Sequence, residues 1–212
     1  MNKYTVEFIG TFFLILVIGL TVIEPNIGNF APLAIGFTLM IMVYAGGAIS
    51  GGHYNPAVTL GVFLRGKCAL KDALIYMIVQ VLAGIVASFV VLYLKGNPVL
   101  TPLKLDLGKA LLNEFLFTFA LVYVVLNVAT SKKTANNSYF GLAIGSTVLI
   151  GALAGGAISG GAYNPVVALG IAGMGLVSWA NIWVYLLGNF AGAIAAATIY
   201  KLTNADEFGS KN

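Results

Sequence analysis

The sequence predicts an all-α membrane protein in which six transmembrane helices and two re-entrant half-helices form an inverted repeat. Two observations carry this prediction. The 212 residues are 59% hydrophobic and only 8% charged, which is too apolar for a soluble domain that must present a polar surface. One long stretch also occurs twice, as AGGAISGGHYNPAVTLG at 45–61 and AGGAISGGAYNPVVALG at 154–170, and this indicates an internal repeat.

Each copy of the repeated stretch predicts a glycine-rich loop followed by a short helix. Glycine permits sharp turns and close backbone approach, and Asn-Pro suits the N-cap and first position of a helix. The apolar run that follows is roughly 15 Å of helix, about half of the roughly 30 Å hydrocarbon core. Irregular backbone at that depth is tolerated only where it is buried or lines an aqueous cavity, so two such loops imply a pore or a binding cavity.

Six longer apolar segments surround these two stretches, three in each half. The segment EFIGTFFLILV at Glu7 resembles EFLFTFALVYV at Glu114, so we expect one transmembrane domain over 1–212, with repeats of about 1–104 and 105–203 and a disordered tail of about 204–212. Three spans per half is an odd number, so the second half enters from the opposite side and the half-helices meet near the midplane. The expected spans are about 4–23, 32–49, 72–94, 109–129, 139–158 and 180–202, and the half-helices are about 55–64 and 164–172.

Basic residues set the expected orientation in a plasma or inner membrane. With both termini in the cytoplasm, most of the lysines and the single arginine fall on the inner side, as the positive-inside rule requires. The inner residues are Lys3, Arg65, Lys67, Lys71, Lys132, Lys133, Lys201 and Lys211, and the outer residues are Lys95, Lys104 and Lys109.

Composition argues against several other classes of function. The net charge of +4 is small and scattered, so nucleic acid is not an expected partner. One histidine, His53, and one cysteine, Cys68, are too few for a metal site or an intrachain disulfide, and we expect no cofactor. Because the loops carry no nucleophile–base pair, we do not expect an enzyme.

Asn55 and Asn164 are expected to line the passage. An N-cap Asn accepts from helix N–H groups through its amide oxygen, which leaves its NH₂ group free to donate into a lumen. Each half-helix also directs about half a positive elementary charge at the same point, which disfavours cations and protons but not neutral acceptors. The alternative is that Asn-Pro merely starts a helix, but two copies in an inverted repeat favour the functional interpretation.

The glycine loops offer carbonyl acceptors to the same passage. Carbonyls without helical partners would form two ladders along which water is passed, although the glycines also permit close helix packing. His53 either lines the inner mouth, where its titration near neutral pH would allow gating, or simply holds the loop. The expected pore-lining loop residues are Gly51, Gly52, His53, Tyr54, Gly160, Gly161, Ala162 and Tyr163.

Glu7 and Glu114 are the acids expected inside the spans. An intramembrane carboxylate is a functional candidate, and a proton relay is one hypothesis. Both residues hold the same place in their halves, where a re-entrant loop has N–H groups to satisfy, and a carboxylate accepts such bonds well. We therefore favour a structural buttress for each loop.

These motifs resemble the aquaporin and aquaglyceroporin (major intrinsic protein) family, through the two Asn-Pro boxes, SGGHYNPAVT and the EF-x-x-TF start of each half. The resemblance implies six tilted helices with two half-helices, a pore in every protomer and a homotetramer. It also implies passive flow of water or small neutral solutes without ions or protons. The residues that match the family's boxes are Asn55, Pro56, Ala57, Asn164, Pro165 and Val166.

The family's selectivity filter maps onto Ile35, Ala152, Gly161 and Val167 by spacing from the boxes. Water-specific members have an aromatic residue, a His, a small residue and an Arg there, and this chain lacks the His and the Arg. Some plant vacuolar members similarly have Val at the Arg position, whereas glycerol channels keep the Arg and place an Asp where Ala168 stands. The resemblance therefore implies a wide, apolar filter that passes water and solutes of the ammonia, urea, glycerol or peroxide type.

Other classes of membrane protein remain as alternatives. A secondary transporter also uses inverted repeats and broken helices, but only Glu7 and Glu114 would be available to couple an ion. A solute facilitator with little water permeability fits the apolar filter. A purely structural membrane protein would not need two aqueous half-loops.

Overall fold

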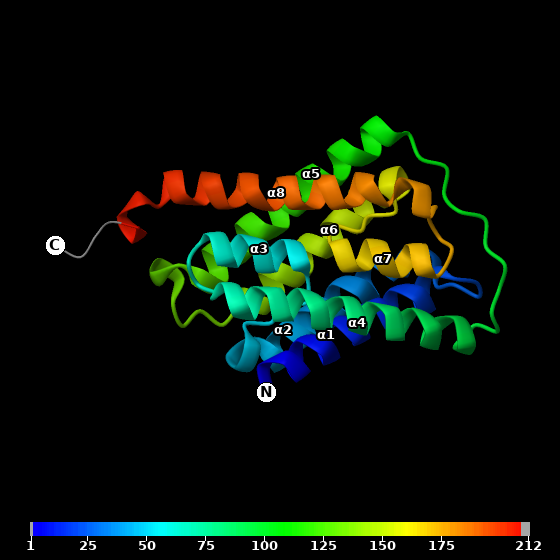
Figure 1. The fold of residues 1–212 in the computed structure, drawn as a ribbon, viewed down its shortest axis with the longest axis horizontal. Coiled ribbons are helices and arrows are strands. Elements are labelled where there is room, and N and C mark those ends of the chain that lie inside the picture. Colours follow the sequence, from blue (N-terminus) through cyan, green and yellow to red (C-terminus); the bar gives the residue numbers. More distant parts are fainter. Residues whose placement is uncertain (1, 209–212) are drawn as a thin grey trace.

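The computed structural model describes residues 2–208 and folds them into helices and connecting loops (Figure 1). Within these residues six helices are long and apolar enough to cross a membrane, and two are short, so the predicted fold class is confirmed. The long helices are α1 (Asn2–Val22), α2 (Ala31–Ser50), α4 (Leu70–Leu94), α5 (Leu107–Val125), α6 (Phe140–Ser159) and α8 (Ile182–Thr203), and the short ones are α3 (Pro56–Leu64) and α7 (Pro165–Gly173).

The two halves repeat one order of elements: two long helices, one short helix and one long helix. Figure 1 shows α3 and α7 lying among the long helices, with α5 and α8 side by side. Each short helix packs against both α4 and α8, one from its own half and one from the other. The two halves therefore interlock around the short helices.

Close helix crossings depend on glycine. A Cβ atom on Gly192 of α8 would lie 2.6 Å from the carbonyl oxygen of Phe115 on α5. Where α2 crosses α6, a Cβ on Gly36 would lie 2.8 Å from the carbonyl oxygen of Gly145. Small residues at these points let backbones touch, which is the usual way in which helices associate within lipid.

Short turns complete the connections. They are η1 (Gly28–Phe30), the π-helical turn η2 (Leu126–Thr130), η3 (Lys132–Thr134), η4 (Trp179–Asn181) and η5 (Ala205–Glu207). Between α4 and α5 the long connection 95–106 runs along one end of the molecule (Figure 1). Its Leu103 N–H donates to the carbonyl oxygen of Leu176 at 2.9 Å, which ties the connection to the segment after α7.

The predicted disordered tail needs correction over residues 204–208. These residues form η5 and the turn after it, and the Glu207 side chain is only 3% exposed. The reason is a buried ion pair with Arg65, a partner far away in the sequence. The rest of the predicted tail, 209–212, lies outside the described residues.

Candidate functional site

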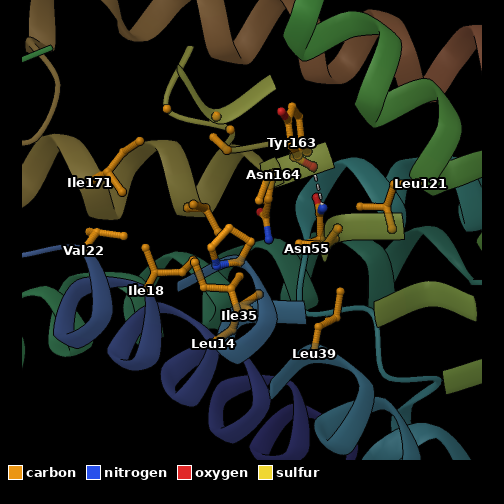
Figure 2. Close-up of a pocket in the computed structure, with 18 of the residues that line it drawn as sticks. Leu14, Ile18, Val22, Ile35, Leu39, Asn55, Leu121, Tyr163, Asn164 and Ile171 are labelled. Carbon is orange, nitrogen blue, oxygen red and sulfur yellow. Dashed lines mark hydrogen bonds between the residues drawn. The ribbon is translucent and has the colours of Figure 1, made fainter. Parts of the chain in front are cut away.

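The N-termini of the two short helices meet inside the molecule. The Asn55 side-chain Nδ2 donates to the carbonyl oxygen of Tyr163 at 2.9 Å, a bond drawn in Figure 2. Reciprocally, Asn164 Nδ2 donates to the carbonyl oxygen of Tyr54 at 3.0 Å. Each amide oxygen meanwhile caps its own helix, accepting from Ala57 N–H in α3 at 2.8 Å and from Val166 N–H in α7 at 3.0 Å. One amide N–H of each Asn is therefore committed to the opposite loop, and one remains.

The loops that lead into the short helices carry local backbone strain. Tyr54 and Tyr163 have φ angles of 50° and 49°, in the left-handed region that non-glycine residues rarely adopt. A pair of glycines stands two and three positions before each tyrosine. The first of each pair, Gly51 or Gly160, ends α2 or α6 in a left-handed conformation. Such strain persists only where surrounding bonds fix the backbone.

Two buried carboxylates supply those bonds. Glu7 on α1 accepts from the N–H groups of His53 at 2.9 Å and Tyr54 at 2.7 Å. Glu114 on α5 accepts from Ala162 N–H at 2.9 Å, and Tyr163 N–H at 2.7 Å. This is the geometry that a structural buttress requires, and the role itself stays a prediction. Because the N–H groups face the carboxylates, the loop carbonyls are free to face the other way.

A central cavity of about 350 Å³ lies on that other side (Figure 2). Ile35, Ala152, Gly161 and Val167 all line it, so the structure brings together the four positions that the sequence assigned to a filter. Both Asn side chains reach it, as do Gly52, His53, Gly160, Ala162 and Tyr163 of the loops. Most of the remaining wall is aliphatic: Leu14, Ile18, Val22, Leu39, Leu121 and Ile171 surround the Asn pair in Figure 2.

Several expected lining residues lie elsewhere. Tyr54 packs its ring into the crossing of α1 and α2, where its hydroxyl donates to the carbonyl oxygen of Met42 at 2.9 Å. The box residues Pro56, Ala57, Pro165 and Val166 are buried outside the cavity lining. A Cβ on Gly84 of α4 would lie 2.7 Å from Val166, so this glycine makes room for the larger residue. Of each box, then, only the Asn side chain reaches the cavity.

A second cavity of about 440 Å³, here called the polar vestibule, adjoins His53. His53 lines both cavities, with its Nδ1 3.1 Å from Thr59 Oγ1 and its ring edge-on to Tyr76. The vestibule holds Lys3 and Asp72, paired at 2.8 Å, together with Lys67, Cys68 and Gly51. Of the two cavities that His53 lines, the vestibule is thus more polar and the central cavity is mostly aliphatic.

Besides the aliphatic wall of the central cavity, the sequence analysis missed two groups of residues. Leu103 lines the central cavity because the long connection 95–106 folds inward. The leucines in this otherwise polar connection were the signal for that fold. The second group is the set of contacts around Glu207, for which a polar tail gave no signal. Within residues 2–208, no cluster of three or more His, Cys, Asp or Glu forms a candidate metal site.

Comparison with known proteins gives a consistent family match. A family model described as major intrinsic protein matches residues 1–200. Aquaporin NIP1-4 of Oryza sativa is 38% identical over 205 residues, covering 92% of this chain and 74% of its own. Glycerol uptake facilitator protein-like 6 of Lactiplantibacillus plantarum is 34% identical over 219 residues, covering 98% of this chain and all of its own.

A solved structure shares the fold. The aquaglyceroporin from Plasmodium falciparum aligns with a TM-score of 0.81 at 22% identity, over 97% of this chain and 98% of the other. At that identity the likeness concerns the fold alone.

Proposed function

The chain belongs to the major intrinsic protein family, and from that premise we propose that it conducts water and small neutral solutes passively through the central cavity. The chain is an integral membrane protein of a family of channels and is not an enzyme.

The observation that carries the proposal is the meeting of two helix N-termini and two Asn amides at an otherwise aliphatic cavity. Asn55 and Asn164 each keep one N–H for a passing acceptor. The helix termini add positive potential there, and no carboxylate lies among the described residues of the cavity wall to offset it. Ions would lose their hydration without replacement, whereas water and neutral solutes exchange hydrogen bonds with the loop carbonyls.

The four filter positions decide the size and polarity of the solute. Ile35, Ala152, Gly161 and Val167 offer small or aliphatic surfaces, without a fixed charge. A solute would bond to loop carbonyls on one side and rest against aliphatic side chains on the other. Ammonia, urea, glycerol and peroxide have the required neutrality and donors, and we propose this class in addition to water.

We also propose how the chain lies in the membrane. Both termini lie in the cytoplasm, so the polar vestibule faces inward and the aliphatic end of the central cavity faces outward. The domain comprises repeats 1–104 and 105–203, and four copies assemble in the bilayer with one pore each. Glu7 and Glu114 hold the loops in place.

The decisive experiment is stopped-flow light scattering on proteoliposomes, with water, glycerol, urea and ammonia gradients compared side by side. Val167→Arg should reduce solute permeability by about tenfold and water permeability much less, because the guanidinium narrows and charges the filter. Val167→Leu is the matched control, since it adds volume without charge, and should have a smaller effect on urea and glycerol. Unchanged solute permeability in Val167→Arg would overturn the filter assignment.

A solute facilitator with little water permeability is the second candidate, favoured by the aliphatic wall. It would show solute flux above water flux in the same assay. A proton-coupled transporter fits less well, because Glu7 and Glu114 already accept hydrogen bonds from loop N–H groups. Flux that depends on an imposed ion gradient would favour the transporter.

A further inference from the structure

We propose that Glu207 is a positioning residue for the polar vestibule, because its carboxylate joins the two chain segments that form much of the vestibule wall. We call residues 204–208 the C-terminal clasp. They lie beyond the residues 1–200 that match the family model. The effect on permeability rests on the proposed channel function, whereas the effect on vestibule geometry does not.

The carboxylate of Glu207 is fully engaged. Its Oε2 pairs with Arg65 Nη2 and accepts from the Tyr200 hydroxyl at 3.1 Å. Its Oε1 accepts from the Ser131 hydroxyl and from Lys132 N–H, the latter at 3.1 Å. The Arg65 and Glu207 side chains are only 5% and 3% exposed, so both charges depend on each other rather than on water.

Aromatic rings complete the surroundings of Arg65. The Phe208 ring centroid lies 4.4 Å from Arg65 Cζ, and the Tyr200 ring centroid lies 5.1 Å from it. A guanidinium at these distances gains cation–π attraction. Glu207 and Phe208 of the clasp therefore hold Arg65 by charge and by ring contact, and Tyr200 of α8 adds a second ring contact.

Two of the partners of Glu207, Arg65 and Ser131, adjoin the vestibule wall. Arg65 caps the C-terminus of α3, and Lys67, Cys68 and Ala69 shortly after it line the vestibule. Ser131 directly follows η2, and Val125, Ala129 and Thr130 before it also line the vestibule. One carboxylate thus fixes the separation of two wall segments that are distant in sequence.

A neighbouring ion pair provides a matched control. Asp206 pairs with Lys133 at 3.1 Å, joining the same clasp to the same loop. These side chains are 62% and 56% exposed, and exposed pairs contribute little to stability. Asp206→Asn removes the same charge as Glu207→Gln from the adjacent residue, but leaves Arg65 held.

The single cysteine serves as a reporter. Cys68 is half-buried in the vestibule wall, and burial raises the pKa of its thiol. Because the thiolate is the reactive form, labelling by a bulky, charged maleimide should be slow in the wild-type protein. We would measure this rate on the full chain in detergent, well below the unfolding temperature, for the wild type, Glu207→Gln and Asp206→Asn.

Glu207→Gln should speed Cys68 labelling by roughly tenfold, since the wall segments separate more often, and Asp206→Asn should label at the wild-type rate. Equal rates for Glu207→Gln and the wild type would overturn the proposal. So would equal acceleration by Asp206→Asn, which would show only a general effect of charge on the thiol. If Glu207→Gln does not fold, Ser131→Ala removes one bond of the same carboxylate and should accelerate labelling more modestly, and no acceleration there would also overturn it.

Permeability is the second readout. In proteoliposomes, Glu207→Gln should change the ratio of urea to water permeability, and a merely structural role would lower both in proportion to the amount of folded protein. If neither the wild-type protein nor any variant conducts water or solutes, the proposed function fails. The labelling rates still decide the role of Glu207.

Discussion

The two loops that enter the short helices share a backbone plan but differ in side-chain chemistry. In both, a carboxylate accepts two successive loop N–H groups and an Asn caps the helix. In the first half, Gln80 also donates to Glu7 Oε2 at 2.9 Å and to Thr59 at 3.2 Å, and Thr59 contacts His53. The first loop therefore sits in a continuous polar network.

The second loop lacks this network. Ala162 and Ala168 stand where the first half has His53 and Thr59. Asn189, which corresponds to Gln80, accepts from Thr118 and leaves its Nδ2 without a partner in the described structure. The two halves therefore share the helix-capping scaffold, whereas the residues that line the cavities differ, polar in the first loop and aliphatic in the second.

We expect the largest loss of stability from variants that remove Glu7 or Glu114, the carboxylates that bind the loop in each half. Glu7→Gln and Glu114→Gln should each lower the free energy of unfolding by roughly 2–4 kcal/mol, because buried N–H groups lose charged acceptors. The loss should be greater for Glu7, which also accepts from Ser50 and Gln80, than for Glu114, whose further donor is Ser159. Unfolding midpoints in detergent would measure the difference.

The same pair of variants tests the rival hypothesis of a proton relay. Glu7→Gln that folds with a wild-type midpoint, yet alters proton flux in pH-gradient vesicles, would contradict the buttress role. Glu7→Asp is the control, since it keeps the negative charge on a side chain that is one methylene group shorter.

Replacing Gln80 of α4 and its counterpart Asn189 of α8 tests whether the two halves differ in stability. Gln80→Leu should destabilise by about 1–2 kcal/mol, because it removes a bond to a buried carboxylate. Asn189→Leu should cost less, since its Nδ2 has no partner to lose and only the neutral Thr118 hydroxyl loses its acceptor. Equal losses of stability in the two variants would show that the halves are energetically alike.

The sequence predicted the repeated scaffold because its signals are local. Asn-Pro after glycines encodes a capped helix wherever it occurs, and long apolar runs encode spans. The carboxylates were found because an acid in such a run needs donors, and the nearby loops have them. The reciprocal bonds between Asn55 and Tyr163 and between Asn164 and Tyr54 were not predicted, since they depend on how closely the two loops meet.

The residues that could not be predicted from the sequence depend on contacts with distant parts of the chain. Leu103 sits in a connection without periodicity, and only its bond to Leu176 brings it to the cavity. Glu207 lies in a polar tail, where burial follows from an arginine 142 residues earlier. Tyr54 and Tyr163 occupy matching places, yet Tyr163 lines the cavity and Tyr54 does not. Such differences arise from packing and leave no local pattern.

Leu103 offers a test of the aliphatic end. Leu103→Ala should raise urea and glycerol permeability by about threefold, because it opens the cavity wall next to the filter, with a smaller change for water. Stopped-flow measurements would detect this. Val99→Ala is the control, since Val99 belongs to the same connection but is fully exposed. An equal response of both variants would place the effect in the connection as a whole rather than in Leu103.

The C-terminal ends of α3 and α7 also differ, and here we expect the smallest effect on stability. Arg65 caps α3 and pairs with Glu207, whereas Met174, its counterpart, caps α7 and is buried against Gly19. Although burial raises the pKa of Glu207, bonds from Ser131, Tyr200 and Lys132 and the Arg65 charge lower it to about 2.

A carboxyl group whose folded pKa lies below its unfolded value of about 4.3 stabilises the fold above that unfolded value and loses the contribution as pH falls towards the folded one. The difference in unfolding midpoint between the wild type and Glu207→Gln should therefore be constant above about pH 5 and shrink between about pH 4 and pH 2. Met174→Leu, at the corresponding end of α7, should show no such pH dependence relative to the wild type. A Glu207→Gln difference that shrinks near neutral pH instead would mean that the clasp is held by a group other than this carboxylate.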